Sequence, residues 1–296
     1  MTISQLNKLY QRKENYIYSK IKGLEGDVSG LQGKLLELLT SEYIGRIQTK
    51  DGKVIVNAYN MRLAAELDSV FDKFNILFQK SVLKSFGNDM LKITEYTSDY
   101  FKGAGFSAKK LNSIQQSMDY ISARIGISDK GEILKGSYLD TLSQNPEVRR
   151  QFKDYVLNSV AGQKDYQGFV KGFKELVVGN KEVNGALQNY YDQYAYDSFN
   201  QVDAAISSHF ANELKLTYFV YFGSIITTSR EFCVKRHGKV FSIKETETWK
   251  NDPTLPGKSK EGYNPLIDRG RWRCRHSIQY IPDLLACKKG KTEACE

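Results

Sequence analysis

The chain has 296 residues, of which 41% are hydrophobic and 26% are charged, and its 43 Lys and Arg residues against 34 Asp and Glu residues give a net charge of +9. This composition is that of an ordinary globular protein, so it excludes disordered tails and fibrous repeats, and the length predicts about two domains. No apolar run reaches the ~18 residues that span a bilayer, and residues 1–6 contain no signal-peptide core. We therefore expect a soluble, unexported protein with no membrane partner.

A regular seam of apolar residues predicts a long N-terminal helix. The apolar positions alternate in steps of four and three from Ile17 to Leu38, as in a bundle or coiled-coil helix. Each glycine inside a helix costs about 1 kcal/mol relative to alanine. This stretch contains four of them, Gly23, Gly26, Gly30 and Gly33. Two interpretations follow: a frayed or kinked helix that begins a bundle, or a bare stripe that another helix approaches in an assembly.

Helical periodicity dominates the next 160 or so residues. A short hairpin comes first, because Asp51-Gly52 supplies a turn that needs positive φ between two apolar runs. Ser107 is a candidate helix N-cap, and Asn145 before Pro146 is a typical helix start. Apolar stripes that predict buried helix faces lie at residues 63–78, 111–125, 148–160, 169–177 and about 180–214.

After Leu214 the pattern becomes that of strands. Residues 216–222 and 225–228, on either side of Gly223, are rich in β-branched and aromatic residues and predict two buried strands. A turn and a short strand are expected over 233–241, then a polar helix around 244–250, a proline-rich loop, and an extended block over 268–278. The predicted fold class is therefore α+β. Its expected parts are an N-terminal helix and hairpin (1–56), a helical domain (57–179) and a small mixed module (180–296).

The positive charge is concentrated in the last third of the chain. From Lys215 onward there are 16 Lys and Arg residues against 9 Asp and Glu residues. In an extended block, alternate side chains share one face, and four arginines would then lie together: Arg269, Arg271, Arg273 and Arg275. Such a face fits a basic strand edge that prevents aggregation, a site for nucleic-acid phosphates, or a site for an acidic partner. Arg236 and Lys239 extend the candidate binding set.

The last third of the chain also carries cysteine and histidine residues at short spacings. Cys233 and His237 are four residues apart, and Cys274 and His276 are two apart. Two thiolates and two imidazoles form the ligand set of a structural zinc site. The alternative is that Cys233 packs against Cys274 in the core and forms a disulfide in an oxidising medium. For the four cysteines as a group, reduced thiols or metal ligands are expected rather than a disulfide framework.

Enzyme motifs are missing from the sequence. It contains no Walker loop, no dinucleotide glycine fingerprint, no His-Glu-x-x-His and no Gly-x-Ser-x-Gly. A Cys233 nucleophile with His276 as its base would lack a third, orienting group. We therefore expect a protein that is not an enzyme.

The C-terminal third resembles a known family. The ordered motif residues are Ser229, Arg230, Phe232, Cys233, Gly238, Lys239, Phe241, Trp249, Gly270, Trp272, Cys274, Arg275 and His276. In order and spacing they resemble the phage Mu F-like minor head proteins, also called the SPP1-type head morphogenesis family, over about residues 180 to 282. Ser229 stands where the family usually has Thr. The arginines at 269, 271 and 273 replace residues that are often apolar, Gly and Asn, and His237 lies at a variable position.

The resemblance implies a non-enzymatic virion component, present in several copies in the head interior or at the portal vertex. Its expected partners are the portal protein and the inner capsid, with packaged double-stranded DNA as a further candidate, and the host cytoplasm is its place during assembly. No cofactor is expected, with a structural zinc as the open alternative. Two other functions stay open: a metal-dependent nuclease or toxin-like effector that uses the Cys/His block, and a zinc-stabilised DNA-binding regulator.

Overall fold

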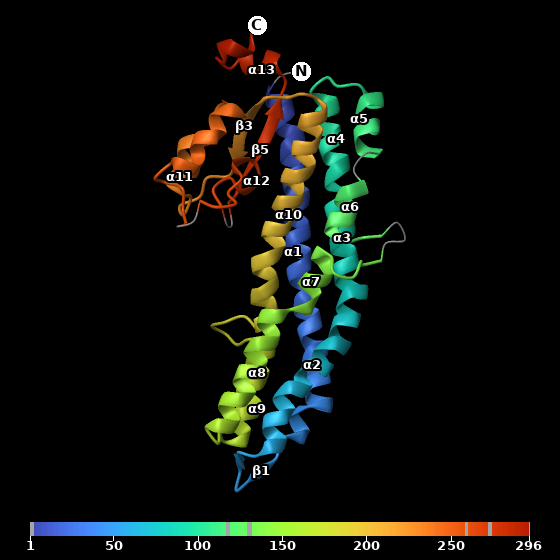
Figure 1. The fold of residues 1–296 in the computed structure, drawn as a ribbon, viewed down its shortest axis with the longest axis vertical. Helices are drawn as coiled ribbons and strands as arrows, with labels where there is room; N and C mark the ends of the chain where they lie inside the picture. Colours follow the sequence, from blue (N-terminus) through green and yellow to red (C-terminus); the bar gives the residue numbers. More distant parts are fainter. Residues whose placement is uncertain (1–2, 117–118, 129–131, 258–259, 272–273, 296) are drawn as a thin grey trace. The chain divides into compact units, whose positions relative to one another are not determined.

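The computed structural model describes residues 3–116, 119–128, 132–257, 260–271 and 274–295. The chain is mainly helical and carries a small antiparallel sheet near its C-terminal end, which confirms the predicted α+β class (Figure 1). Across these ranges, none of the helices combines the length and the apolar character needed to span a bilayer.

Contacts within the chain define two compact units, each built from separate segments. Unit 1 contains Met1–Ser19, Asp89–Ile121 and Tyr196–Glu296, and unit 2 contains Lys20–Asn88 and Ser122–Ala195. Each unit therefore combines segments from several of the three consecutive ranges expected from the sequence. Helices α1 (Ile3–Glu42) and α10 (Ala186–Glu213) contribute residues to both units.

Helix α1 runs without interruption through the four glycines. A Cβ added at any of them would meet no atom within 4 Å, so the glycine stripe faces open space. The apolar seam on the other side of the helix is buried, as the sequence predicts. The idea that the glycines mark an assembly surface stays a prediction.

Unit 2 is a set of helices around an aromatic core. Its elements, besides the parts of α1 and α10, are η1 (Ile44–Arg46), β1 (Thr49–Lys50), β2 (Lys53–Val54), α2 (Ala58–Phe78), η2 (Gln79–Leu83), α7 (Tyr138–Gln144), α8 (Pro146–Ala161) and α9 (Tyr166–Val178), with α3 (Lys84–Leu91) at its boundary. Phe152 of α8 packs edge-to-face on Phe71 of α2 and on Phe173 of α9, with ring centroids 5.4 and 5.2 Å apart. These contacts join three helices through one buried ring.

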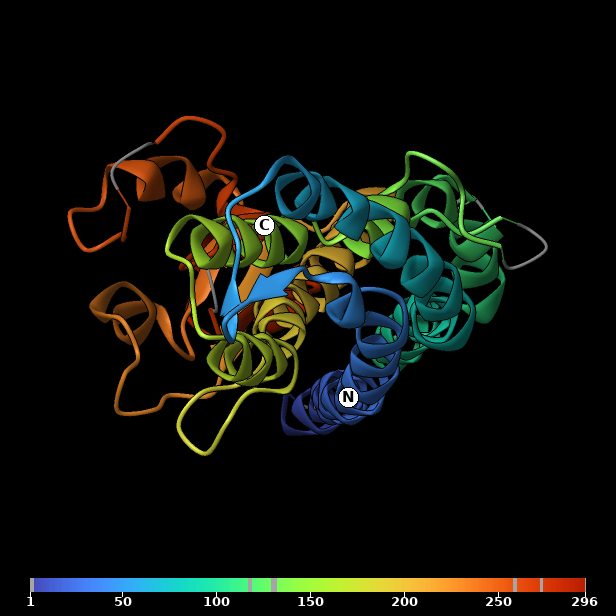
Figure 2. The ribbon, with the colours of Figure 1, turned by 90° about the horizontal axis from the view of Figure 1, so that it is seen from below.

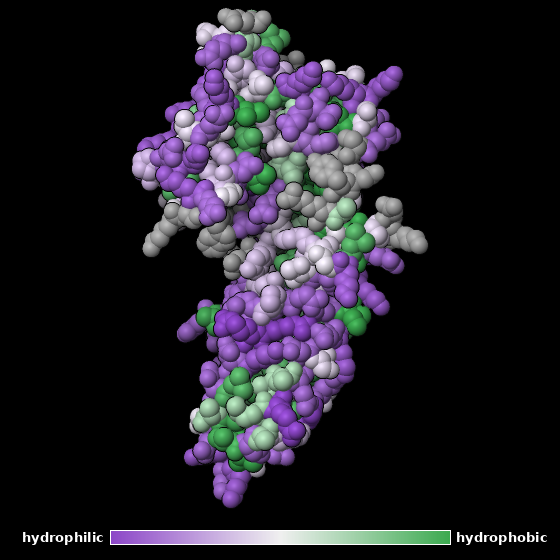
Figure 3. All heavy atoms as spheres, in the orientation of Figure 1, coloured by the Kyte–Doolittle hydropathy of each residue, from purple (hydrophilic) through white to green (hydrophobic). Residues whose placement is uncertain are grey.

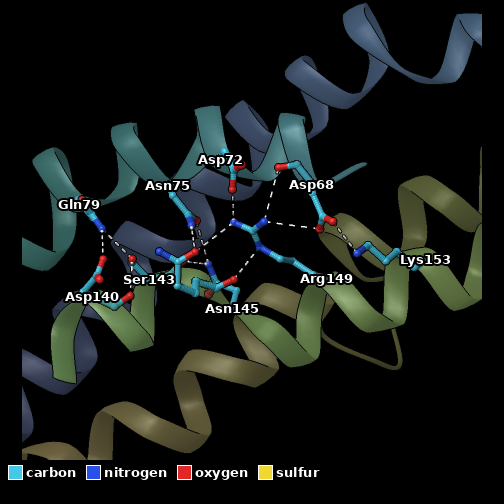
Figure 4. A network of polar contacts seen from close by, with 10 residues as sticks. Asp68, Asp72, Asn75, Gln79, Asp140, Ser143, Asn145, Arg149 and Lys153 are labelled. Atoms are coloured by element: carbon cyan, nitrogen blue, oxygen red, sulfur yellow. Dashed lines mark hydrogen bonds and ion pairs between the residues drawn. The ribbon is translucent and has the colours of Figure 1, made fainter. Parts of the chain in front are cut away.

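A polar network on the same helices sets the register of α8 against α2 (Figure 4). Arg149 donates hydrogen bonds to the Asp72 carboxylate at 2.8 Å and to the Gln144 carbonyl at 2.7 Å. One turn later, Lys153 pairs with Asp68 at 2.7 Å. Since both carboxylates are largely exposed, these ion pairs orient the helices more than they stabilise the fold.

The predicted hairpin is present at β1 and β2. Asp51 and Gly52 both have positive φ, 51° and 74°, as the tight turn requires. Figure 2 shows the hairpin from below, beside the turn that joins α8 to α9. The Val54 amide donates to the Lys164 carbonyl at 2.9 Å, so this short hairpin is held by a third segment.

Unit 1 contains the C-terminal module. The elements of unit 1, besides the parts of α1 and α10, are α4 (Ile93–Gly103), α5 (Ala108–Gln116) and, at its boundary, α6 (Asp119–Ile125). The C-terminal module adds β3 (Tyr218–Gly223), α11 (Glu231–Arg236), β4 (Val240–Ser242), η3 (Lys244–Asn251), α12 (Pro265–Asp268), β5 (His276–Ile281), α13 (Asp283–Cys287) and η4 (Thr292–Ala294). The strands form an antiparallel sheet in the order β4-β3-β5. Val220 pairs with Val240 and Gly223 pairs with His276.

Three predicted elements differ from the structure. Residues 225–228 do not form a strand: the Ser229 hydroxyl accepts a hydrogen bond from the Ile226 amide at 2.8 Å in a turn, and Ile226 is exposed. The expected turn at residue 233 is the short helix α11. The long helix begins at Ala186 rather than near 180, because the Asn180 side chain accepts two backbone N–H groups in a turn.

The four cysteines behave as two pairs. Cys287 and Cys295 form a disulfide, contrary to the expectation of reduced thiols or metal ligands for the whole group. Helix α13 ends at Cys287 and the following turn brings the Cα of Cys295 to 5.0 Å, within the range that a disulfide needs. Cys233 and Cys274 are reduced.

Candidate metal centre

Cys233 and Cys274 meet inside the C-terminal module. Cys233 lies on α11, Cys274 lies two residues before β5, and both side chains are buried with their sulfurs 3.6 Å apart. This confirms the prediction that they pack together. His276, the first residue of β5, completes the cluster: one ligand atom from each of the three residues lies within 4.8 Å of the other two.

Gly270 allows the chain to pass close to both sulfurs. A Cβ at this position would lie 2.4 Å from the Cys233 sulfur and 3.1 Å from the Cys274 sulfur. A residue with a side chain at this position would therefore require at least the Cys233 sulfur to shift. Arg230, just before α11, donates to the Gly270 carbonyl at 3.1 Å and so joins the two segments that carry the cysteines.

Aromatic side chains enclose the cluster. The Tyr221 ring stacks on His276 with centroids 5.0 Å apart, and its hydroxyl lies 3.5 Å from each sulfur. Behind it, the buried Trp249 makes edge-to-face contacts with Tyr221, Phe232 and Phe241 at 5.2 to 5.6 Å. On the side of these rings the cluster is shielded from water, which strengthens electrostatic interactions inside it.

Charge within the cluster favours one thiolate. A hydrogen bond shared with Cys233 lowers the pKa of Cys274, and a hydrogen bond with His276 and the buried guanidinium of Arg269 contribute to this lowering. The same hydrogen bond raises the pKa of Cys233, and burial raises the pKa of Tyr221. The pair of cysteines therefore loses its first proton readily, and a deprotonated thiolate is the form that a metal ion binds.

The fourth predicted ligand, His237, lies beside the cluster rather than in it. Its ring centroid is 5.4 Å from that of His276, at an interplanar angle of 80°. Burial lowers the pKa of His237, and the proximity of His276 lowers it further. The structure thus assembles three of the four predicted ligands.

The predicted arginine face is wrong. Residues 269–271 form a turn after α12, with positive φ at Arg269 (49°) and Arg271 (65°), and β5 begins only at His276. Positive φ breaks the side-chain alternation on which the prediction depended. Arg269 is buried and donates to the His276 carbonyl at 2.8 Å, whereas Arg275 is exposed. Arg273 lies outside the described residues.

Of the two added basic candidates, only Lys239 is exposed. Arg236 is buried, with its guanidinium 2.6 Å from the Asp252 carboxylate and 3.7 Å from the centre of the Phe232 ring. It is therefore an internal structural residue, not a nucleic-acid ligand.

The remaining motif residues support the same module. Phe232 and Phe241 contact Trp249, Gly238 adopts positive φ (72°) in the turn between α11 and β4, and Ser229 holds the turn before α11. Trp272 lies outside the described residues.

Sequence reasoning missed the buried ionic groups next to this centre. Lys13 on α1 pairs with Asp203 on α10 at 2.6 Å, and Glu14 accepts a hydrogen bond from Ser277 at 3.2 Å. Burial raises the pKa of Glu14. The available signal was Lys13 itself, because it occupies a seam position between Tyr10 and Ile17 where the helix period requires an apolar residue.

A cavity of about 440 Å³ opens onto the cluster. Cys274 and Arg269 form part of its wall, together with Tyr263 and the acidic residues Asp197 and Glu261. This cavity provides a route by which a small ion or molecule reaches Cys274 from solvent. The sequence did not indicate it, because its walls come from α10 and from the loop on either side of α12.

In comparisons with known proteins, no protein-family model matches this chain, and neither a curated protein nor a solved structure matches it.

Proposed function

We propose that this chain is a bacteriophage minor head protein, a virion structural component that assists head morphogenesis and DNA packaging or delivery near the portal. The observation that carries the proposal is the convergence of the motif residues. Cys233, Trp249, Gly270, Cys274 and His276 are separated in sequence but pack in one buried cluster. Such packing is expected if the resemblance reflects a shared module rather than a chance run of residues.

The proposal assigns portal or inner-capsid binding to the helical part. Helix α9 offers a groove of about 520 Å³, lined by Tyr166, Val170 and Val178, and Val178 is 45% exposed. Figure 3 shows exposed apolar side chains in the region of α8 and α9. Lys171, Lys174 and Glu175 border the groove, so a surface with apolar residues and charges of both signs would complement it. The predicted arginine face, which the structure does not form, has no binding role in this proposal.

Mass spectrometry of purified particles tests this function. The chain should be present in a fixed ratio to the portal protein, and its absence from mature particles and from assembly intermediates would contradict the proposal. Incubation with duplex DNA and Mg²⁺ or Zn²⁺ tests the alternative: cleavage that disappears in His276→Ala would identify a nuclease instead.

The α9 groove is tested by substitution. Val170→Asp together with Val178→Asp should reduce incorporation into particles while the purified protein keeps its helical circular dichroism. Val183→Asp is the matched control, because Val183 is 58% exposed but lies outside the groove. Equal incorporation of both variants would exclude this surface.

A further inference from the structure

We propose that Cys233, Cys274 and His276 bind one structural Zn²⁺ ion, with His237 as the fourth ligand. The inference concerns the chemistry of the C-terminal module and does not depend on the virion function.

The distance between the two sulfurs is the first argument. Two thiolates at about 2.3 Å from a tetrahedral zinc are about 3.8 Å apart, whereas a disulfide holds its sulfurs at about 2.05 Å. The observed 3.6 Å is close to the first value and far from the second. Gly270 permits this arrangement, since any side chain there would overlap the Cys233 sulfur.

The second argument is the state of His276. Its side chain is almost completely buried, and no nitrogen or oxygen atom of the described residues forms a hydrogen bond with either ring nitrogen, so that the Cys274 thiol is the polar group beside it. A buried polar atom without a partner costs free energy, so an imidazole is expected in such a place only if something else binds it. A metal ion bound at one nitrogen removes that cost and accounts for a histidine at the start of a buried strand.

His237 is the nearest candidate for the fourth position. Its Nδ1 is also buried and has no partner in the described part of the chain. Two imidazoles on one tetrahedral ion have ring centres about 5 Å apart, and the observed separation from His276 is 5.4 Å. The three other ligand atoms already lie within 4.8 Å of one another, so a change in the position of the His237 side chain is what the complete set requires.

The ligand set also selects the ion. Thiolate and imidazole favour zinc, whereas Mg²⁺ and Ca²⁺ require oxygen ligands. Two thiolates neutralise the charge of Zn²⁺, which makes burial of the ion among aromatic rings favourable. The cavity that reaches Cys274 gives the ion a path from solvent.

The zinc ion would therefore act as a structural cross-link. The ion would connect α11 (Cys233) to the start of β5 (His276), across the irregular segment that contains α12. Short helices and loops bury little apolar surface of their own, so a metal supplies the stability that a larger core would give.

Metal analysis of the full chain, purified under reducing conditions, tests the proposal. We expect one zinc per chain after dialysis against metal-free buffer. Replacement by Co²⁺ should give the visible absorption of a tetrahedral site with a thiolate-to-cobalt charge-transfer band. Strong chelators should remove the ion and lower the melting temperature.

Variants identify the ligands. Cys233→Ser and Cys274→Ser should retain at most a tenth of the wild-type zinc, and His237→Ala should retain zinc with at least tenfold weaker affinity. Cys287→Ser is the matched control and should retain one zinc, because Cys287 belongs to the separate disulfide. His276→Cys shows whether loss of zinc in the other variants reflects a lost ligand or a failure to fold. It should keep zinc and strengthen the charge-transfer band, since it adds a third thiolate.

Two results would overturn the proposal. One is reduced wild-type protein that holds less than a tenth of an equivalent of zinc after incubation with the ion. The other is Cys287→Ser losing zinc to the same extent as Cys233→Ser. If His237→Ala binds as tightly as wild type, the fourth ligand is wrong.

Discussion

Lys13 on α1 and Asp203 on α10 form an ion pair of 2.6 Å whose side chains are only 4% and 3% exposed. The Lys13 ammonium also donates to the Ser207 hydroxyl at 3.2 Å, so both charges are paired inside unit 1. Taking two charges out of water is costly, and such a pair contributes more to a defined arrangement than to stability.

The first prediction concerns this pair. Lys13→Met leaves the Asp203 carboxylate buried without its partner and should lower the free energy of unfolding by roughly 3–5 kcal/mol. The double variant Lys13→Met with Asp203→Leu should recover most of that loss, because neither charge is then buried. Urea unfolding of the three proteins measures the difference. Additive losses in the double variant would show that the two side chains do not interact.

The second prediction concerns Gly270. Gly270→Ala places a methyl group 2.4 Å from the Cys233 sulfur and should destabilise the chain by about 1–3 kcal/mol. Gly30→Ala on α1 is the control, because a Cβ there meets nothing within 4 Å and should instead stabilise the helix by up to about 1 kcal/mol. Thermal unfolding of both variants tests this, and equal melting temperatures would contradict the close approach.

The third prediction is a pH dependence at Asp252. Burial alone would raise the pKa of this carboxyl, but hydrogen bonds from Thr254 and Arg236 lower it from 3.8 to about 2. A lowered pKa in the folded state stabilises the protein above pH 3.8, and that contribution disappears as the pH falls through 2. The shift corresponds to about 2 kcal/mol.

Asp252→Asn tests this pH dependence. The variant should be less stable than wild type by at least about 2 kcal/mol at neutral pH, and the difference should shrink as the pH falls from 4 to 2. Denaturant titrations at several pH values measure it. A difference that stays constant with pH would show that the carboxylate is not coupled to Arg236.

The fourth prediction distinguishes two arginines of the predicted arginine face, Arg269 and Arg275. Arg269→Met removes hydrogen bonds to two backbone carbonyls, the buried one of His276 and the partly buried one of Ile267, and should cost roughly 2–3 kcal/mol. Arg275→Ala changes an exposed side chain and should stay within about 0.5 kcal/mol of wild type. Comparable stability of the two variants would contradict the buried turn.

The helices were predictable because their signal is repeated many times over. The apolar seam of α1 and the stripes of α2, α8 and α9 each repeat over several turns, and Asn145-Pro146 marks the start of α8 as expected. The hairpin was predictable from two residues, Asp51 and Gly52, because few residues tolerate positive φ. Local chemistry determines these elements.

The candidate site was predictable only in part. Spacing selected Cys233, Cys274 and His276, which the fold brings together. The arginine face failed because alternation holds only in a strand, and nothing local in the sequence indicated that Arg269 and Arg271 take positive φ. Tyr221 was missed because it reads as one strand residue among several aromatic ones, and its role depends on contacts with distant segments.

The segmented construction of unit 1 has a consequence for the order of folding. The Tyr100 hydroxyl donates to the Tyr280 carbonyl at 2.7 Å, and Ser277 donates to Glu14 on α1. These contacts of Glu14 and Tyr100 can therefore form only after strand β5, which follows all of unit 2 in the chain, has been synthesised. All of unit 2 lies within residues 20–195, so it can become compact earlier on the ribosome. A fragment limited to residues 180–296 would lack these N-terminal contacts and should fold poorly on its own.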